Sequence, residues 1–134
     1  MPEIANYVLQ GAMKITPLTV KKLLHELPML KLEFTQIHAP KFPHLVDQLT
    51  FLADVVEDFA EGEADELPYR AAAEAAFALL YAHKRADLIP DFIPDFGRAD
   101  DSVVVRSVLI THEKHFRAYA EKHHMNWDKI TNEA

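Results

Sequence analysis

The sequence has no cysteine among its 134 residues. This absence excludes disulfides, thiolate zinc sites, iron–sulfur clusters and a cysteine nucleophile, and it fits a reducing compartment. Glycine occurs only three times, and none of the three belongs to a Gly-rich loop of the kind that cradles phosphates. These absences remove several common classes of redox, metal-binding and nucleotide-binding protein.

Positive charge and long apolar runs are also scarce. The 14 lysines and arginines face 21 aspartates and glutamates, for a net charge of −7. Nucleic acid requires clustered basic residues, and an acidic chain gains nothing from anionic lipid surfaces, so we expect neither partner. The longest weakly polar stretch, 71–82, is interrupted by Glu74 and is shorter than the roughly 20 residues that span a bilayer. With no leader pattern at the start, we expect a soluble, cytoplasmic protein.

The apolar residues that are present recur at helical spacing, which predicts an all-α fold with no strand. The clearest helix covers 45–59, where five apolar residues lie three or four positions apart: Leu45, Leu49, Leu52, Val56 and Phe59. Gly62 is placed to cap the end of this helix. Seven acidic side chains and no basic one occur between Asp54 and Glu66. We interpret them as a solvated helix face that runs into an acidic turn, with an electrostatic docking patch as the alternative.

Three more helices are expected. Thr16 and Pro17 are typical of an N-cap and a first helical position, and Pro28 should kink or split the helix that they open. An alanine-rich helix begins at Pro68 and is apolar nearly all round, which favours the centre of a bundle. The last long helix is expected from about Arg98 to His124.

These elements predict one domain, 1–134, folded as an antiparallel bundle of four main helices. Residues 1–15 are expected to form an arm or a short helix. Trp127 and Ile130 are expected to fold the tail back onto the bundle.

The segment from Asp87 to Asp101 combines aspartates, prolines and large apolar residues, and it reads Asp-Leu-Ile-Pro-Asp-Phe-Ile-Pro-Asp-Phe-Gly-Arg-Ala-Asp-Asp. Asp87 and Asp91 are placed to cap short turns. Gly97 permits a left-handed backbone just before the last helix. Asp100 and Asp101 would then lie near the N-terminus of that helix, where the helix dipole favours negative charge.

The run Asp-Leu-Ile-Pro-Asp-Phe-Ile-Pro, followed by Gly97 and the Asp100-Asp101 pair, resembles the signature of YkvA-like bacterial domains of unknown function. The resemblance is strongest over 71–109, within a related part that covers 68–124, and a related domain occurs in a membrane-bound RING-type ubiquitin ligase. It implies a small helical domain, often membrane-associated, without an established activity. Some charged residues depart from the family pattern, namely Lys84-Arg85, Asp95 and Arg98. They favour a soluble protein over a membrane-associated one.

Two sets of residues offer candidate ligands for a divalent metal. Asp87, Asp91, Asp100 and Asp101 supply hard oxygen ligands. Alternatively, His112 and His115 lie three positions apart on one predicted helix, a spacing that can chelate a metal.

For function, we expect a noncatalytic domain without a cofactor that acts through protein–protein contacts, with a second copy or with another protein. The apolar motif and the alanine-rich helix are the candidate surface. Two alternatives stay open, namely a metal-dependent enzyme that uses the aspartate cluster and a peripheral membrane protein. The membrane alternative requires Leu88, Phe92 and Phe96 to be exposed together.

Overall fold

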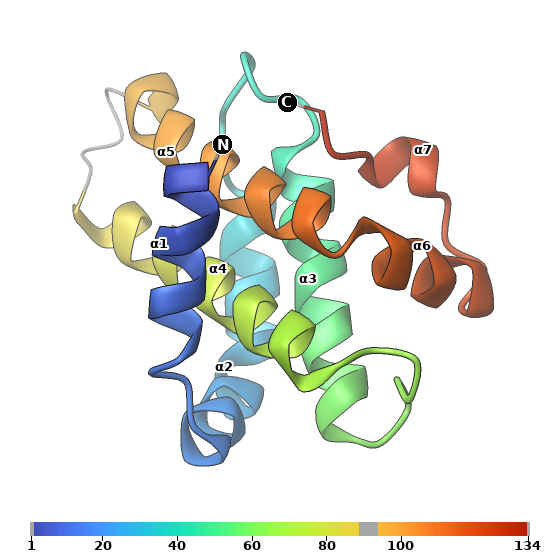
Figure 1. Ribbon diagram of the computed structural model, residues 1–134. Coiled ribbons are helices and arrows are strands. Elements are labelled where there is room, and N and C mark those ends of the chain that lie inside the picture. The colour runs from blue at the N-terminus through green and yellow to red at the C-terminus, as the bar shows by residue number, and fades with distance from the viewer. Residues whose placement is uncertain (1, 89–93, 134) are drawn as a thin grey trace.

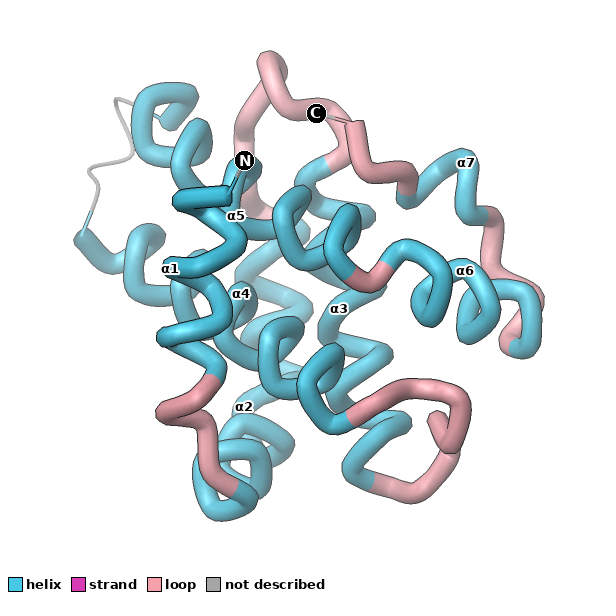
Figure 2. Tube along the Cα trace, viewed as in Figure 1, coloured by secondary structure: helices cyan, strands magenta, loops and turns pink. Residues whose placement is uncertain are grey.

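The computed structural model describes residues 2–88 and 94–133, and the side chains of 3–83 and 99–133. Its described residues form helices and no strand, as Figures 1 and 2 show. The helices are α1 (Pro2–Ala12), α2 (Pro17–Thr35), α3 (Leu45–Ala60), α4 (Tyr69–Leu88), α5 (Pro94–Thr111), α6 (Glu113–Lys122) and α7 (Trp127–Ile130). The all-α bundle is therefore confirmed, and the first residues form a short helix, but the described part of the chain has seven helices in place of four main ones.

Local signals in the sequence set the ends of α2 and α3. Thr16 caps α2, since its side chain accepts a hydrogen bond from the backbone N–H of Thr19 at 3.2 Å, and Pro17 occupies the first helical position. After α3, Gly62 takes a φ of +77°. The backbone N–H groups of Gly62 and Glu63 then bond to the carbonyls of Phe59 and Asp58, which is the Schellman arrangement that favours glycine.

The alanine-rich helix α4 is central, as expected. It packs against α1, α2, α3 and α5. Most of its alanines are fully buried, among them Ala71, Ala75, Ala76 and Ala78. Small side chains on this helix let its neighbours approach closely. The alanines of α4 whose side chains are described therefore form core, and they do not add to an exposed patch.

Helix α1 approaches α4 closely at Gly11. A Cβ atom at this position would lie 2.2 Å from the ring of Phe77, far inside van der Waals contact. The glycine is thus required by the packing of α1 on α4, because any larger side chain would push the two helices apart or displace the ring.

One expectation about a helix boundary is wrong, and another is narrowed. Helix α2 continues through Pro28 as one element, so the helix is not split there, and a kink at Pro28 stays a prediction. The expected last long helix starts at Pro94 and is interrupted at His112, whose φ of −116° and ψ of 25° leave helical geometry. Beyond this break, the side chains of Phe116 and Tyr119 on α6 are fully buried in the core.

The C-terminal tail returns to the bundle as predicted. Ile130 is buried, and the indole of Trp127 packs edge-on against Phe51 with 5.8 Å between ring centroids. The buried amide of Gln48 donates hydrogen bonds to the carbonyls of Thr131 and Glu133 at 3.0 and 2.7 Å. These bonds hold the tail against α3.

Candidate functional site

The residues of the acidic motif lie at the junction of α4 and α5. Asp87 belongs to the last turn of α4, and its side chain lies outside the described part. Asp91 lies outside the described residues altogether, and the side chains of Leu88, Phe92 and Phe96 lie outside it too. The capping, metal and membrane hypotheses that need these side chains therefore stay predictions.

Gly97, Asp100 and Asp101 do not have the backbone setting expected from the sequence. Because α5 begins at Pro94, Gly97 lies within its first turn and not in a turn before it, where φ is negative. Asp100 and Asp101 lie about two turns into the helix, beyond the reach of the dipole at its N-terminus. Asp100 is exposed and Asp101 is fully buried, so the two adjacent carboxylates point to different environments.

The histidine pair is also divided between two environments. His112 is buried at the α5–α6 break, whereas His115 is exposed on α6. Among the residues whose side chains are described, no three His, Asp or Glu side chains are grouped as ligands of one metal ion.

His112 meets Glu74 of α4 inside the protein, a pairing that the sequence analysis missed. Nε2 of His112 lies 3.1 Å from Oε1 of Glu74, an ion-pair distance without the alignment of a good hydrogen bond. The other carboxylate oxygen of Glu74 accepts a hydrogen bond from Nε of Arg70 at 2.7 Å. Burial would raise the pKa of Glu74, but His112 and Arg70 outweigh it and hold the pKa below its usual value. The only signal in the sequence was a glutamate that interrupts an alanine run.

A second polar cluster joins the end of α3 to α6. The hydroxyl of Tyr119 donates a hydrogen bond to Oδ2 of Asp58, and the ring of His123 lies over that of Tyr119 at 4.3 Å between centroids. Lys122 pairs with Glu66 at 3.2 Å. Burial and the Asp58 carboxylate raise the pKa of Tyr119 far above its usual value. Part of the acidic segment after Asp54 is thus engaged in structural pairs and is not a simple solvated face.

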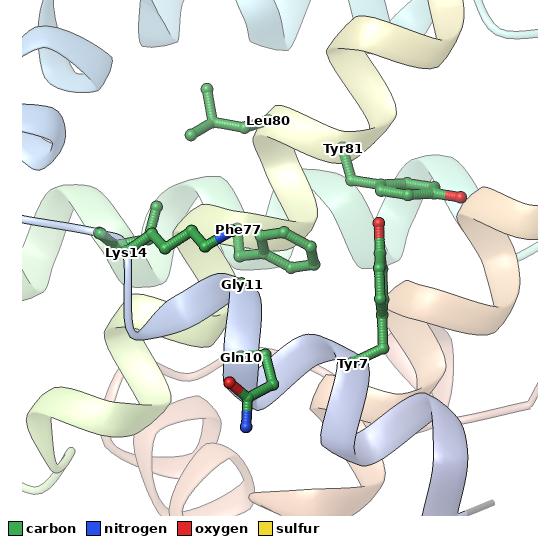
Figure 3. Close-up of a pocket in the computed structure, with 8 residues that line it drawn as sticks. Tyr7, Gln10, Gly11, Lys14, Phe77, Leu80 and Tyr81 are labelled. Atoms are coloured by element: carbon green, nitrogen blue, oxygen red, sulfur yellow. The ribbon is translucent and has the colours of Figure 1, made fainter.

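An open pocket of about 370 Å³ lies between α1 and α4 (Figure 3). Tyr7, Gln10 and Lys14 line it from α1 and the turn that follows, and Phe77 and Tyr81 line it from α4. The ring of Tyr7 meets those of Phe77 and Tyr81 edge to face, with centroids 5.6 and 6.2 Å apart. Aromatic walls with a few polar groups are typical of sites that bind an apolar side chain or a small ligand.

A second open pocket, of about 350 Å³, lies between the start of α2 and the end of α3. Pro17 and Lys21 line it from α2, and Phe59 and Tyr69 line it from the other side. The hydroxyl of Tyr69 donates a hydrogen bond to the carbonyl of Ile15, which lines the first pocket. The two pockets therefore flank the turn between α1 and α2.

The side chains around this turn form what we call the corner surface. It comprises Met13, Lys14, Leu18, Lys21, Lys22 and Tyr69, all of them exposed. Met13 and Leu18 are 71% and 61% exposed. The sequence held one signal for this surface: no aspartate or glutamate occurs from Ile4 to His25, in a chain that is acidic overall.

Comparison with known proteins adds a family of unknown function. The family model "Protein of unknown function (DUF1232)" matches residues 71–105, which cover most of α4 and the first part of α5. The comparisons with curated proteins and with solved structures found no match. No helix among the described residues is long and apolar enough to cross a membrane. Over 71–105 the chain is therefore similar to the DUF1232 proteins of unknown function, and its resemblance to YkvA-like domains is consistent with that family.

Proposed function

We propose that this chain is a noncatalytic helical domain that acts through protein–protein contacts at the corner surface. The observation that carries the proposal is the exposure there of large apolar side chains beside lysines that form no ion pair with any described side chain. Single exposed apolar residues are ordinary. A group of them, rimmed by charge and flanked by pockets, has the composition of an interface.

The two pockets add depth to this surface. Binding energy at interfaces is concentrated in a few anchor side chains that fill such pockets. One pocket is walled by Tyr7 and Phe77 and the other by Phe59 and Tyr69, so each offers aromatic contact to an apolar anchor. A lysine lines each pocket, Lys14 in the first and Lys21 in the second, which favours a partner with acidic residues beside its anchors.

Burial of the polar pair argues against catalysis at Glu74 and His112. Their side chains are 1% and 7% exposed, and a general acid or base must reach the proton that it transfers. The proposal requires no cofactor. We place the domain in the cytoplasm because a chain without cysteine fits a reducing compartment.

Site-specific photo-crosslinking in cells tests the proposal. A photo-reactive residue replaces Leu18 in one variant and Leu32 in the control. Both leucines belong to α2 and they are 61% and 66% exposed, yet they lie about 21 Å apart along the helix. We expect a discrete protein adduct from position 18 and not from position 32. No adduct from either position, or the same adducts from both, would refute a contact at the corner surface.

A further inference from the structure

Resting on the proposed function, we infer that the partner at the corner surface is a second copy of this chain. The three lysines of the corner surface are not the only exposed charges at this end of the molecule. The turn between α3 and α4 carries three exposed acidic side chains, Glu61, Glu63 and Asp65, which we call the acidic turn.

Both charged groups are unsatisfied within the part of the chain whose side chains are described. None of the three lysines and none of the three acids forms an ion pair there, whereas Lys31 pairs with Asp54 at 2.8 Å and Lys122 with Glu66 at 3.2 Å. Opposite charges at one end of the bundle thus form no ion pair with a described side chain of the same copy.

The two groups are neighbours on the surface. Lys21 lines the α2–α3 pocket together with Phe59 and Ala60, and the acidic turn follows directly after Ala60 in the chain. Figure 2 shows the turn between α1 and α2 and the turn between α3 and α4 as two loops at the lower end of the molecule. This end therefore has a basic side and an acidic side, with Tyr69 and the pocket between them.

A two-fold axis that passes between the two sides makes this surface complementary to itself. The rotation lays the lysines of each copy against the acidic turn of the other, so both charge contacts form at once. A self-complementary patch is what a two-fold interface requires. An unrelated partner would have to carry both charge groups in the matching order. The exposed side chains of Met13 and Leu18 would be buried in the same contact and supply its apolar part.

Charge reversal on each side, measured by sedimentation equilibrium, tests the inference. One variant carries Lys21→Glu and Lys22→Glu, and the other carries Glu61→Lys and Glu63→Lys. Each change acts twice in a symmetric dimer, so we expect each variant alone to raise the dimer dissociation constant by at least about tenfold. We expect an equal mixture of the two variants to regain the dimer, because one copy then presents mainly acidic groups and the other mainly basic groups.

Matched controls reverse equally exposed charges that lack an ion pair elsewhere in the described part. They are Lys41→Glu with Lys114→Glu, and Glu3→Lys with Glu121→Lys. These pairs should leave the dissociation constant within about twofold of the parent protein, since they lie outside the contact. Recovery of the dimer by mixing also shows that both reversal variants are folded.

The inference is overturned if the parent chain stays monomeric up to millimolar concentration, if the control pairs weaken the dimer equally, or if mixing fails to restore it. Photo-crosslinking at position 18 distinguishes a failure of the inferred dimer from a failure of the proposed function. An adduct with a different protein keeps the contact surface and rejects the second copy, and the absence of any adduct rejects both.

Discussion

Glu74 and His112 face each other in the interior, whereas the lysines of the corner surface face solvent at the turn between α1 and α2. In the interior, the buried carboxylate of Glu74 lies within 3.1 Å of both His112 and Arg70. At the corner, Lys14, Lys21 and Lys22 have none among the described side chains. An unpaired charge destabilises the folded protein when it is buried, whereas an exposed unpaired charge is solvated by water and does not.

The difference separates charges that hold the fold from charges that are free to contact a partner. Substitutions in the interior should change the free energy of unfolding, and they should change association only through that loss of folded protein. Substitutions at the corner should change association and leave the free energy of unfolding nearly constant.

The largest expected effect is at the buried pair. His112→Ala should lower the free energy of unfolding by about 3 kcal/mol, because it removes one of the two partners of a buried carboxylate and leaves a cavity beside Phe116. Urea denaturation measures the change. His115→Ala is the matched control, and as an exposed histidine it should stay within about 0.5 kcal/mol of the parent. Equal losses in the two variants would show that the buried pair does not stabilise the fold.

The next effect is at the contact of α1 with α4. Gly11→Ala should cost about 2 kcal/mol in urea denaturation, since its Cβ would lie 2.2 Å from the ring of Phe77. Adding Phe77→Leu should recover part of the loss by removing the ring. A Gly11→Ala variant as stable as the parent would mean that α1 can shift away from α4 without cost.

A smaller effect is expected where α6 meets α3. Tyr119→Phe removes the hydroxyl that donates to Asp58 and should cost about 1.5 kcal/mol, as expected for a hydrogen bond to a charged acceptor. The raised pKa of Tyr119 adds a pH dependence. The stability that the protonated phenol supplies is complete below the usual tyrosine pKa of 10.0 and is lost as the pH rises above it. Across this pH range, the free energy of unfolding should fall more steeply for the parent than for Tyr119→Phe. The same slope in both proteins would contradict the burial of this hydroxyl.

The sequence predicted those elements whose signals are local. Leucine spacing located α3, Thr16 and Pro17 located the start of α2, and Gly62 located the cap after α3, because propensity, capping and left-handed geometry depend on residues a few positions apart. The break at His112 has no proline or glycine to mark it. It coincides with the burial of His112 beside Glu74, 38 positions away in the chain, a contact that helical periodicity cannot reveal.

The candidate site was harder to predict for the same reason. Leu18 fits the apolar pattern of α2 as well as Leu23 does, yet Leu18 is 61% exposed and Leu23 is buried. Which apolar residue is covered depends on where the neighbouring helices end. At Gly97, the sequence suggested a left-handed turn, but the helix starts at Pro94, a residue whose missing N–H is tolerated at the first helical position.

The most direct test of the central claim measures association and stability on one pair of variants, Leu18→Glu and Leu32→Glu. Both place a charge on an exposed position of α2, so both should keep the free energy of unfolding within about 0.5 kcal/mol of the parent. In sedimentation equilibrium, we predict that Leu18→Glu is monomeric and that Leu32→Glu associates like the parent. The account is contradicted if Leu18→Glu associates normally, or if the two variants lose association to the same degree.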